Sequence, residues 1–285
     1  MSHMQHPDGR LSLQFEYDAR SARTLLHVAE QRQPLKVVRA FHVEGAALAH
    51  VHNLSGGVLA GDRLSLHMEI GPRARAQVTS TGATRLYRSR PEAGPAAMTA
   101  RVNVGEGALL EYLPDALIPF AGSRFQQNTV VNLEDSAGLF WWETVAPGRE
   151  ARGEIFSYSE LQLRFDLRAA GIPVAVERCH LDPPARALES PARLGPYRYF
   201  SSFFICYTGT GESTWRELEK QLQELAGKLS SRVIIWGLGR LPAHGLVVRA
   251  LSQNGRDIHG GLVAFWRVAK RALYGQDAVI PRKIY

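Results

Sequence analysis

LSLHMEIGPRA, residues 64–74, is the stretch that decides the fold, because it places a strand pattern directly before a turn pattern. Apolar and polar side chains alternate from Leu64 to Ile70, which is typical of a β-strand with one buried face. The Gly71-Pro72 pair that follows predicts a turn. Ala74 then opens another apolar run, so the stretch predicts a strand, a turn and a second strand.

The same pattern returns twice further along the chain. The segments GEGA (residues 105–108) and EDSA (residues 134–137) each follow an alternating run and open another apolar one. Ala74 and the alanines of these segments are spaced by 34 and then 29 residues. Such repeats are typical of stacked supersecondary units that share one core, although hairpin turns in a sandwich are an alternative. We therefore expect a mainly β fold, a layered, β-helix-like stack of strands.

Other runs predict further strands. Residues 11–17 alternate, as do residues 155–158 running on into residues 161–167. The continuous apolar run GLFWW at residues 138–142 favours a strand that is covered on both faces.

Helical periodicity begins late in the chain. Residues 215–229 predict an amphipathic helix, with apolar side chains at spacings of three and four: Trp215, Leu218, Leu222, Leu225 and Leu229. Ser213 or Thr214 is expected to cap its start, with Glu217 in a capping-box position. A second helix is expected at residues 261–274, with Leu262, Phe265, Trp266, Ala269 and Leu273 inside.

The chain divides at about residue 200. Residues 1–200 are expected to form the layered β scaffold, and the Pro- and Arg-rich residues 182–197 a loop. Residues 201–285 are expected to form an α+β portion packed on the scaffold, with strands at residues 232–236 and 246–251. A single continuous domain is the alternative.

The composition is ordinary for a soluble globular protein. Hydrophobic residues make up 45% of the 285 residues and charged residues 21%. No run reaches the roughly 18 apolar residues of a membrane span, and residues 1–7 lack the apolar core of a signal peptide, so we expect a cytoplasmic protein. The net charge of +7 is spread along the chain without a nucleic-acid-binding motif, which favours an acidic protein partner over nucleic acid or membrane.

Cys179 and Cys206 are the two cysteines. They lie far apart in the sequence and match no CxxC pattern, which argues against a disulfide framework or a zinc cluster. Two buried, apolar thiols are the expected outcome.

The segment from His50 to Asp62 is the densest unusual stretch. His50 and His52 alternate, so both side chains fall on one face of a strand. With Asp62 nearby, they could contact a borderline divalent metal such as nickel. Paired surface histidines beside a glycine turn are the alternative. The Gly56-Gly57 pair lacks the frame of a phosphate-binding loop, and no GxSxG nucleophile motif occurs in the chain.

Several carboxylates sit in or beside apolar strands, namely Glu111, Asp115, Glu143, Glu154 and Glu177. Half-buried carboxylates need partners, and Arg149, Arg152 and Arg178 are close in sequence to three of them. Structural ion pairs are one interpretation of this pattern. A polar passage lined by these groups is the other.

The order of motifs in the chain resembles the family of the urease accessory protein UreD, called UreH in some organisms. The matching elements are GGxxxGDRL from Gly56, TSTGATRLYRS at residues 79–89, LEYLPDALIPF at residues 110–120, GRxxxGExF from Gly148 and VER at residues 176–178. A single motif would be weak evidence, whereas five in order are specific. They cover residues 56 to about 180.

The resemblance implies a mostly β fold, layered like a short β-helix, with two helices toward the C-terminus. It also implies a non-catalytic role in urease maturation. Members bind UreF directly and the GTPase UreG through the complex, and the complex docks on apo-urease. Nickel is expected to pass transiently or weakly through this complex, and no tightly bound cofactor is expected.

The resemblance also assigns roles to individual residues. Asp62 and Glu177 match acidic positions of the family motifs and are expected to line a nickel passage, with Arg178 orienting Glu177 through a charge-assisted hydrogen bond. The expected supporting polar residues are Glu143, Arg149 and Glu154, and the motif glycines are Gly56, Gly57 and Gly61. No ligand role is carried over to His50 or His52, because Leu54-Ser55 replaces the proline pair of many members.

Two other functions remain as alternatives. A β-helical carbohydrate-active enzyme would need paired carboxylates across a cleft, and Glu111 with Asp115 could be cast in that role. A basic nucleic-acid-binding module would show a steep dependence of affinity on salt.

Overall fold

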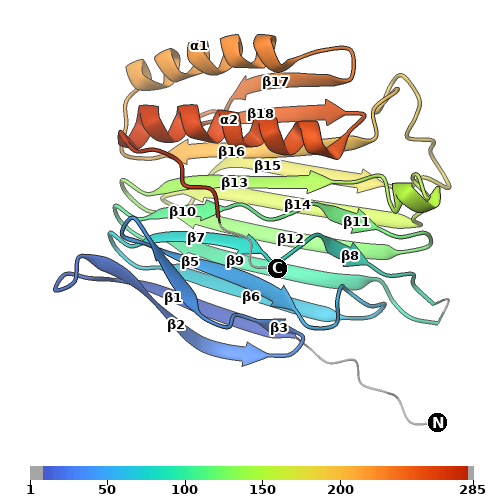
Figure 1. Cartoon of the computed structure of the whole chain (residues 1–285), viewed down its shortest axis with the longest axis horizontal. Coiled ribbons are helices and arrows are strands. Elements are labelled where there is room, and N and C mark those ends of the chain that lie inside the picture. Colours follow the sequence, from blue (N-terminus) through green and yellow to red (C-terminus); the bar gives the residue numbers. More distant parts are fainter. Residues whose placement is uncertain (1–8, 91, 282–285) are drawn as a thin grey trace.

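Two stacked β-sheets and two helices make up the structure, a computed structural model that describes residues 9–90 and 92–281 (Figure 1). Residues 1–7, which carry the expectation about a signal peptide, lie outside the described residues. No helix in the described part of the chain has the length and apolar character needed to cross a membrane.

The smaller sheet has seven strands in the order β15-β14-β12-β9-β6-β1-β2. Their bounds are β1 (Arg10–Asp18), β2 (Arg23–Arg32), β6 (Arg63–Ile70), β9 (Ala96–Val104), β12 (Arg124–Leu133), β14 (Glu160–Ala169) and β15 (Ile172–Leu181). Pairing is parallel from β1 through β6, β9 and β12 to β14. The edge strands β2 and β15 are antiparallel to their neighbours.

The larger sheet has eleven strands, with the main path β17-β18-β16-β13-β10-β7-β5-β3 and with β4, β8 and β11 attached beside it. The strands of its lower part are β3 (Leu35–Lys36), β4 (Ala40–Val43), β5 (Ala46–Asn53), β7 (Arg75–Ser80) and β8 (Thr84–Leu86). The remaining strands are β10 (Leu109–Tyr112), β11 (Leu117–Pro119), β13 (Gly138–Val145), β16 (Tyr199–Tyr207), β17 (Ile234–Arg240) and β18 (Gly245–Ser252). Strands β16, β18 and β17 extend the same sheet, so both portions expected from the sequence share it.

Three equivalent turns connect the two sheets, joining β6 to β7, β9 to β10 and β12 to β13. In each turn the alanine N–H bonds back to the carbonyl three residues earlier, at 3.0, 3.0 and 3.3 Å for Ala74, Ala108 and Ala137. The third residue of each turn is left-handed, with φ of 61° at Arg73, 64° at Gly107 and 52° at Ser136. All three alanines are buried. The repeat in the sequence is therefore one coil of the stack, and the mainly β, layered prediction is confirmed.

One strand prediction is wrong. Residues 155–158 form a loop, and strand structure begins only at Glu160. Phe156 has a positive φ of 49°, and its N–H bonds to the carbonyl of Pro147 at 2.8 Å. The segment alternates because its side chains turn in and out of a folded loop, with Tyr158 buried.

Both helices lie near the β17–β18 end of the stack, and both begin earlier than predicted (Figure 1). Helix α1 spans Glu212–Leu229, and its N-cap is Gly211, without the side-chain cap expected from Ser213 or Thr214. Helix α2 spans Gly255–Tyr274. Its first turns are glycine-rich and carry no apolar stripe, but burial of Ile258 holds them in place.

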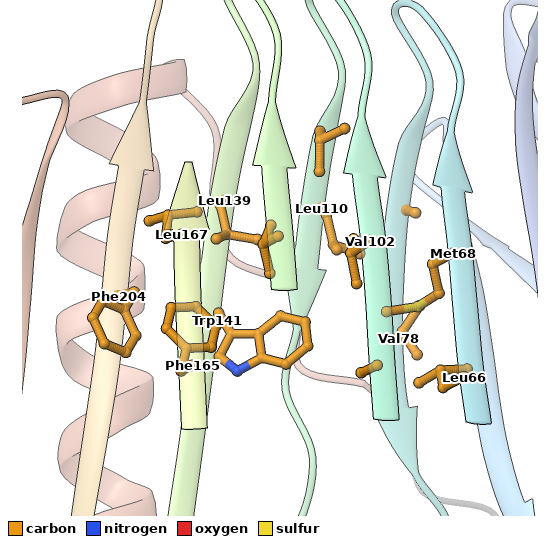
Figure 2. Packing of buried hydrophobic residues seen from close by; sticks show 14 of the residues in the cluster. Leu66, Met68, Val78, Val102, Leu110, Leu139, Trp141, Phe165, Leu167 and Phe204 are labelled. Atoms are coloured by element: carbon orange, nitrogen blue, oxygen red, sulfur yellow. The ribbon is translucent and has the colours of Figure 1, made fainter. Parts of the chain in front are cut away.

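Two hydrophobic cores fill the layers. The first lies between the sheets, where Trp141 of β13 packs on Phe165 with ring centroids 5.6 Å apart, and Phe165 stacks on Phe204 at 4.4 Å (Figure 2). The second lies between the larger sheet and the helices and includes Phe140 and Trp266. Residues 138–142 are buried throughout, as predicted for a strand covered on both faces.

Candidate functional site

A row of four hollows runs through the polar part of the interface between the sheets. We call them the loop cavity, of about 290 Å³, the middle cavity, of about 70 Å³, the narrow cavity, of about 20 Å³, and the open groove, of about 800 Å³. Each hollow shares wall residues with the next. The loop and middle cavities share Thr84, Met98, Tyr112 and Pro114; the middle and narrow cavities share Glu143, Val145 and Leu163; the narrow cavity and the groove share Glu177, Cys179, Phe200 and Ser202.

The glycine motif shapes the first of these hollows. Gly56 has a φ of 71°, and a Cβ on Gly57 would lie 2.6 Å from the carbonyl oxygen of Arg85. This close approach lets Val58 pair with β8, where its N–H bonds to the Arg85 carbonyl at 2.7 Å. Both glycines line the loop cavity. The motif therefore forms one wall of the cavity through its backbone.

Asp62 is buried, with 2% of its surface exposed, but its carboxylate is used within the loop. Oδ2 accepts a hydrogen bond from the N–H of Leu59 at 2.9 Å, and the Asp62 carbonyl accepts one from Ala97 at 2.8 Å. Gly61, with a φ of 80°, allows the tight return of the chain. These contacts give Asp62 a role in holding the loop beside the cavity.

His50 and His52 lie on β5 but face away from the hollows. Ala47 and Ala49 of the same strand pack between the sheets, so the alternate positions face the opposite side. His50 is buried against the ring of Phe41, with centroids 5.6 Å apart, so the surface-histidine alternative is wrong for it. Burial, followed by the charge of His50, lowers the pKa of His52. Among residues 9–90 and 92–281, no three His, Cys, Asp or Glu side chains are grouped as a metal site.

Glu143 of β13 lies at the centre of the row and lines both the middle and the narrow cavities. Its Oε1 accepts a hydrogen bond from Nε2 of Gln127 at 2.6 Å. Burial, with a smaller contribution from the nearby Glu177 carboxylate, raises the pKa of Glu143 to about 7, against the opposing effect of the hydrogen bond from Gln127. The side chain can therefore gain or lose a proton near neutral pH.

Glu177 of β15 stands between the narrow cavity and the open groove. Its Oε1 accepts hydrogen bonds from Oγ of Ser202 at 2.9 Å and from Nη1 of Arg249 at 3.0 Å. Its Oε2 is buried and has no hydrogen-bond partner among the described residues. One oxygen of this carboxylate thus remains available to a ligand.

Arg178 does not make the expected bond to the Glu177 carboxylate. Its Nη2 donates to Oδ1 of Asp166 at 2.7 Å, and its Nη1 donates to the backbone carbonyls of Phe165 and Glu177. Neighbouring residues on a strand point to opposite faces, so Arg178 cannot share the inner face with Glu177. Arg249 makes the bond instead.

The sequence reasoning missed Arg249. A signal was present, because Arg249 is the charged residue within the apolar strand predicted at residues 246–251. What the sequence could not supply was the strand on which its partner lies.

Arg149 and Glu154 form a structural pair at the end of β13. Nε of Arg149 donates to Oε2 of Glu154 at 2.8 Å, the N–H of Ala121 donates to the same oxygen at 3.1 Å, and the guanidinium lies 4.2 Å from the ring centroid of Phe120. Hydrogen bonding to Arg149 lowers the pKa of Glu154. A Cβ on Gly148 would lie 2.5 Å from the Glu154 carbonyl oxygen, so the motif closes this loop tightly.

Glu111 and Asp115 lie in different layers. Glu111 faces α2, where it pairs with Nζ of Lys270 at 2.9 Å and accepts a bond from Nε1 of Trp266 at 2.8 Å. Burial raises the pKa of Glu111. Asp115 instead lines the middle cavity. The structure therefore does not bring the two carboxylates together across a cleft.

The two cysteines differ. Cys206 is buried, as predicted, whereas Cys179 is partly exposed and lines both the narrow cavity and the open groove. Both thiols are free.

Comparison with known proteins gives one consistent result. A family model described as UreD urease accessory protein matches residues 7–284. A protein named urease accessory protein UreD from Herpetosiphon aurantiacus is 42% identical over 99% of this chain and 98% of its own length. Proteins with the same name from Pseudomonas fluorescens and Pseudomonas aeruginosa are each 31% identical over 97% of this chain and 95% of their own lengths.

Proposed function

Because the chain belongs to the UreD family of urease accessory proteins, we propose that it is a non-catalytic scaffold of urease maturation with an internal passage for nickel. It binds UreF directly, is joined to UreG through that complex, and docks on apo-urease in the cytoplasm. Nickel is the cargo of this passage and is held only transiently. Neither nucleic acid nor membrane takes part.

The row of hollows is the observation that carries the proposal. Four consecutive hollows share walls across the interior, and the last of them is open to solvent. Three acidic side chains, Asp115, Glu143 and Glu177, stand along the row. Carboxylates placed along an apolar interior are expensive to bury, and a route for cations gives them a purpose.

The narrow cavity sets the chemistry of passage. A cavity needs roughly 10–15 Å³ of volume to hold one water molecule. The narrow cavity, with about 20 Å³, therefore holds about one water. A divalent cation with its full water shell does not fit there. Glu143 and Glu177 both line this cavity, and their oxygens can replace the waters that the cation sheds. Because there are few donors, the ion is bound weakly and can leave again.

The test is activation of urease in cells that supply the cognate UreF, UreG and urease. Glu143→Gln and Glu177→Gln keep the side-chain volume but remove the charge. We expect the nickel content and activity of urease to fall to a small fraction of wild type, because a neutral amide does not offset the cost of dehydrating the cation. Glu224→Gln, on the exposed face of α1, is the matched control and should activate normally.

Co-purification with UreF separates transport from assembly. Both passage variants should still elute in a stoichiometric complex with UreF, because their side chains lie between the sheets. Wild-type activation by both variants would refute the passage. A wild-type chain that remains monomeric and indifferent to UreF would refute the scaffold role itself.

A further inference from the structure

The narrow cavity and the open groove share Glu177 and Ser202, and both of these side chains bond to Arg249 of the groove wall, which no motif pointed to. Strands β13, β16 and β18 place Glu143, Ser202 and Arg249 in one row, because Glu143 is in register with Ser202 and Ser202 with Arg249. Glu177 reaches this row from β15 of the other sheet. Oε1 of Glu177 and Oγ of Ser202 lie 3.0 and 3.1 Å from Nη1 of Arg249. The guanidinium thus lies beside the Glu177 carboxylate where the passage opens.

We propose that Arg249 is a gate residue that closes the groove end of the passage to cations. The proposal rests on the passage described above and adds the residue that controls it. In the closed state the guanidinium holds Oε1 of Glu177 and places a positive charge at the opening. In the open state the arginine swings into the groove and leaves the carboxylate to the cation.

The exposure of the arginine makes this movement feasible. The side chain of Arg249 is 55% exposed and lines the open groove, whereas Glu177 is only 22% exposed. An exposed ion pair contributes little net stability, so the arginine can leave at small cost. Glu177 cannot follow, because it extends from a paired position on β15 opposite Phe165. The cation and the mobile Arg249 side chain therefore compete for the carboxylate of Glu177, which stays in place.

The charge at the opening changes when the gate moves. With Arg249 in place, the Glu177–Arg249 pair is neutral overall, and an approaching dication meets the guanidinium first. With Arg249 displaced, the carboxylate stands alone, and its buried Oε2 has no partner among the described residues. Movement of Arg249 thus changes the opening from one that repels a dication to one that attracts it.

Cys179 supplies a reporter for this gate, because its thiol lines both the narrow cavity and the open groove. Cationic and anionic methanethiosulfonate reagents of similar size would be reacted with the full chain at one fixed pH. Cys179→Ser gives the background from Cys206, which is buried. The measured quantity is the ratio of the cationic rate to the anionic rate.

We expect Arg249→Gln to raise this ratio at least about threefold. The charge of Arg249 repels the cationic reagent and attracts the anionic one, and its removal changes both rates even with strong solvent screening. Arg249→Lys, which retains the charge, should keep the wild-type ratio. Arg164→Gln is the matched control, because it removes the same charge from an exposed position on β14, away from the Glu177 carboxylate.

Three results would overturn the gate. The ratio could stay unchanged in Arg249→Gln, both reagents could accelerate equally as in a merely loosened structure, or Arg164→Gln could raise the ratio as much. The assay contains no nickel, so it tests the gate separately from the passage. If Glu143→Gln and Glu177→Gln both still activate urease, the passage fails and the gate fails with it. If both variants lose activation while the reagent ratio stays unchanged in Arg249→Gln, the gate alone is overturned.

Discussion

Replacing Glu143 by glutamine should make the protein more stable above neutral pH and flatten its stability profile below it. Glu143 is enclosed between the sheets, and its pKa is raised from 4.5 to about 7, first by burial and then by Glu177. Glutamine has nearly the same shape and keeps a carbonyl oxygen to accept the hydrogen bond of Gln127. The substitution therefore removes the charge with little change in packing.

The direction in which stability changes with pH follows from the number of protons bound by the folded and the unfolded chain. Between pH 4.5 and about 7 the folded protein holds a proton on Glu143 that the unfolded chain has lost. The free energy of unfolding therefore falls as the pH rises through this range and levels off above about 7. The full shift corresponds to about 3 kcal/mol at about 1.4 kcal/mol per pH unit, and water in the adjoining cavities reduces it to about 1–3 kcal/mol.

Urea unfolding at pH 5, 6, 7 and 8, roughly spanning the titration range, measures this effect. The difference between Glu143→Gln and wild type should be small at the acid end and grow to about 1–3 kcal/mol at the alkaline end. Glu111 also has a raised pKa, but it is present in both proteins and cancels in the difference. Parallel profiles of variant and wild type at all four pH values would refute the assigned protonation.

Two further predictions concern helix α2. Lys270→Met should destabilise the chain by about 3–5 kcal/mol in urea unfolding, because Glu111 loses its buried counter-charge, and adding Glu111→Gln should restore most of the loss. No recovery in the double variant would contradict this account. Gly261→Ala should cost about 1–3 kcal/mol, because a Cβ there would lie 2.0 Å from Cζ2 of Trp236. Gly260→Ala has open space and should stabilise the helix by about 0.4–1 kcal/mol, and equal thermal midpoints for the two glycine variants would refute the packing argument.

The coil repeat was readable from the sequence because its signals are local. Alternation at residues 64–70, the Gly71-Pro72 turn pair and the small Ala74 all act within one strand–turn–strand unit. The misread segment at residues 155–158 shows the limit of the same signal, since a folded loop can alternate without pairing. Helix α2 begins earlier than the sequence predicted, because its first turns are held by the burial of Ile258. Such a tertiary contact leaves no local signal in the sequence.

The candidate site was predictable only in part. Glu143 and Glu177 were singled out because they interrupt apolar strands, and the hollows they line lie between the sheets. Strands β10 and β13 of the larger sheet are covered on both faces, so alternation fixes which residues share a face but not which layer that face meets. Glu111 therefore looked equivalent to Glu143, yet it meets helix α2. Arg249 and Lys270 were missed because their partners come from distant strands.

The two sheets differ in length, and this difference would give the proposed passage its opening. The smaller sheet ends at β15, whereas the larger one continues from β16 through β18 to β17, as Figure 1 shows. The inner face of this overhang is not covered by a strand of the smaller sheet, and its residues form the wall of the open groove. Arg249 lies at the start of the overhang, one strand beyond Ser202. A single row of paired residues thus leads from the half-buried Glu143 through Ser202 to the exposed Arg249, and the step between the two sheet edges places this arginine where the proposed gate would act.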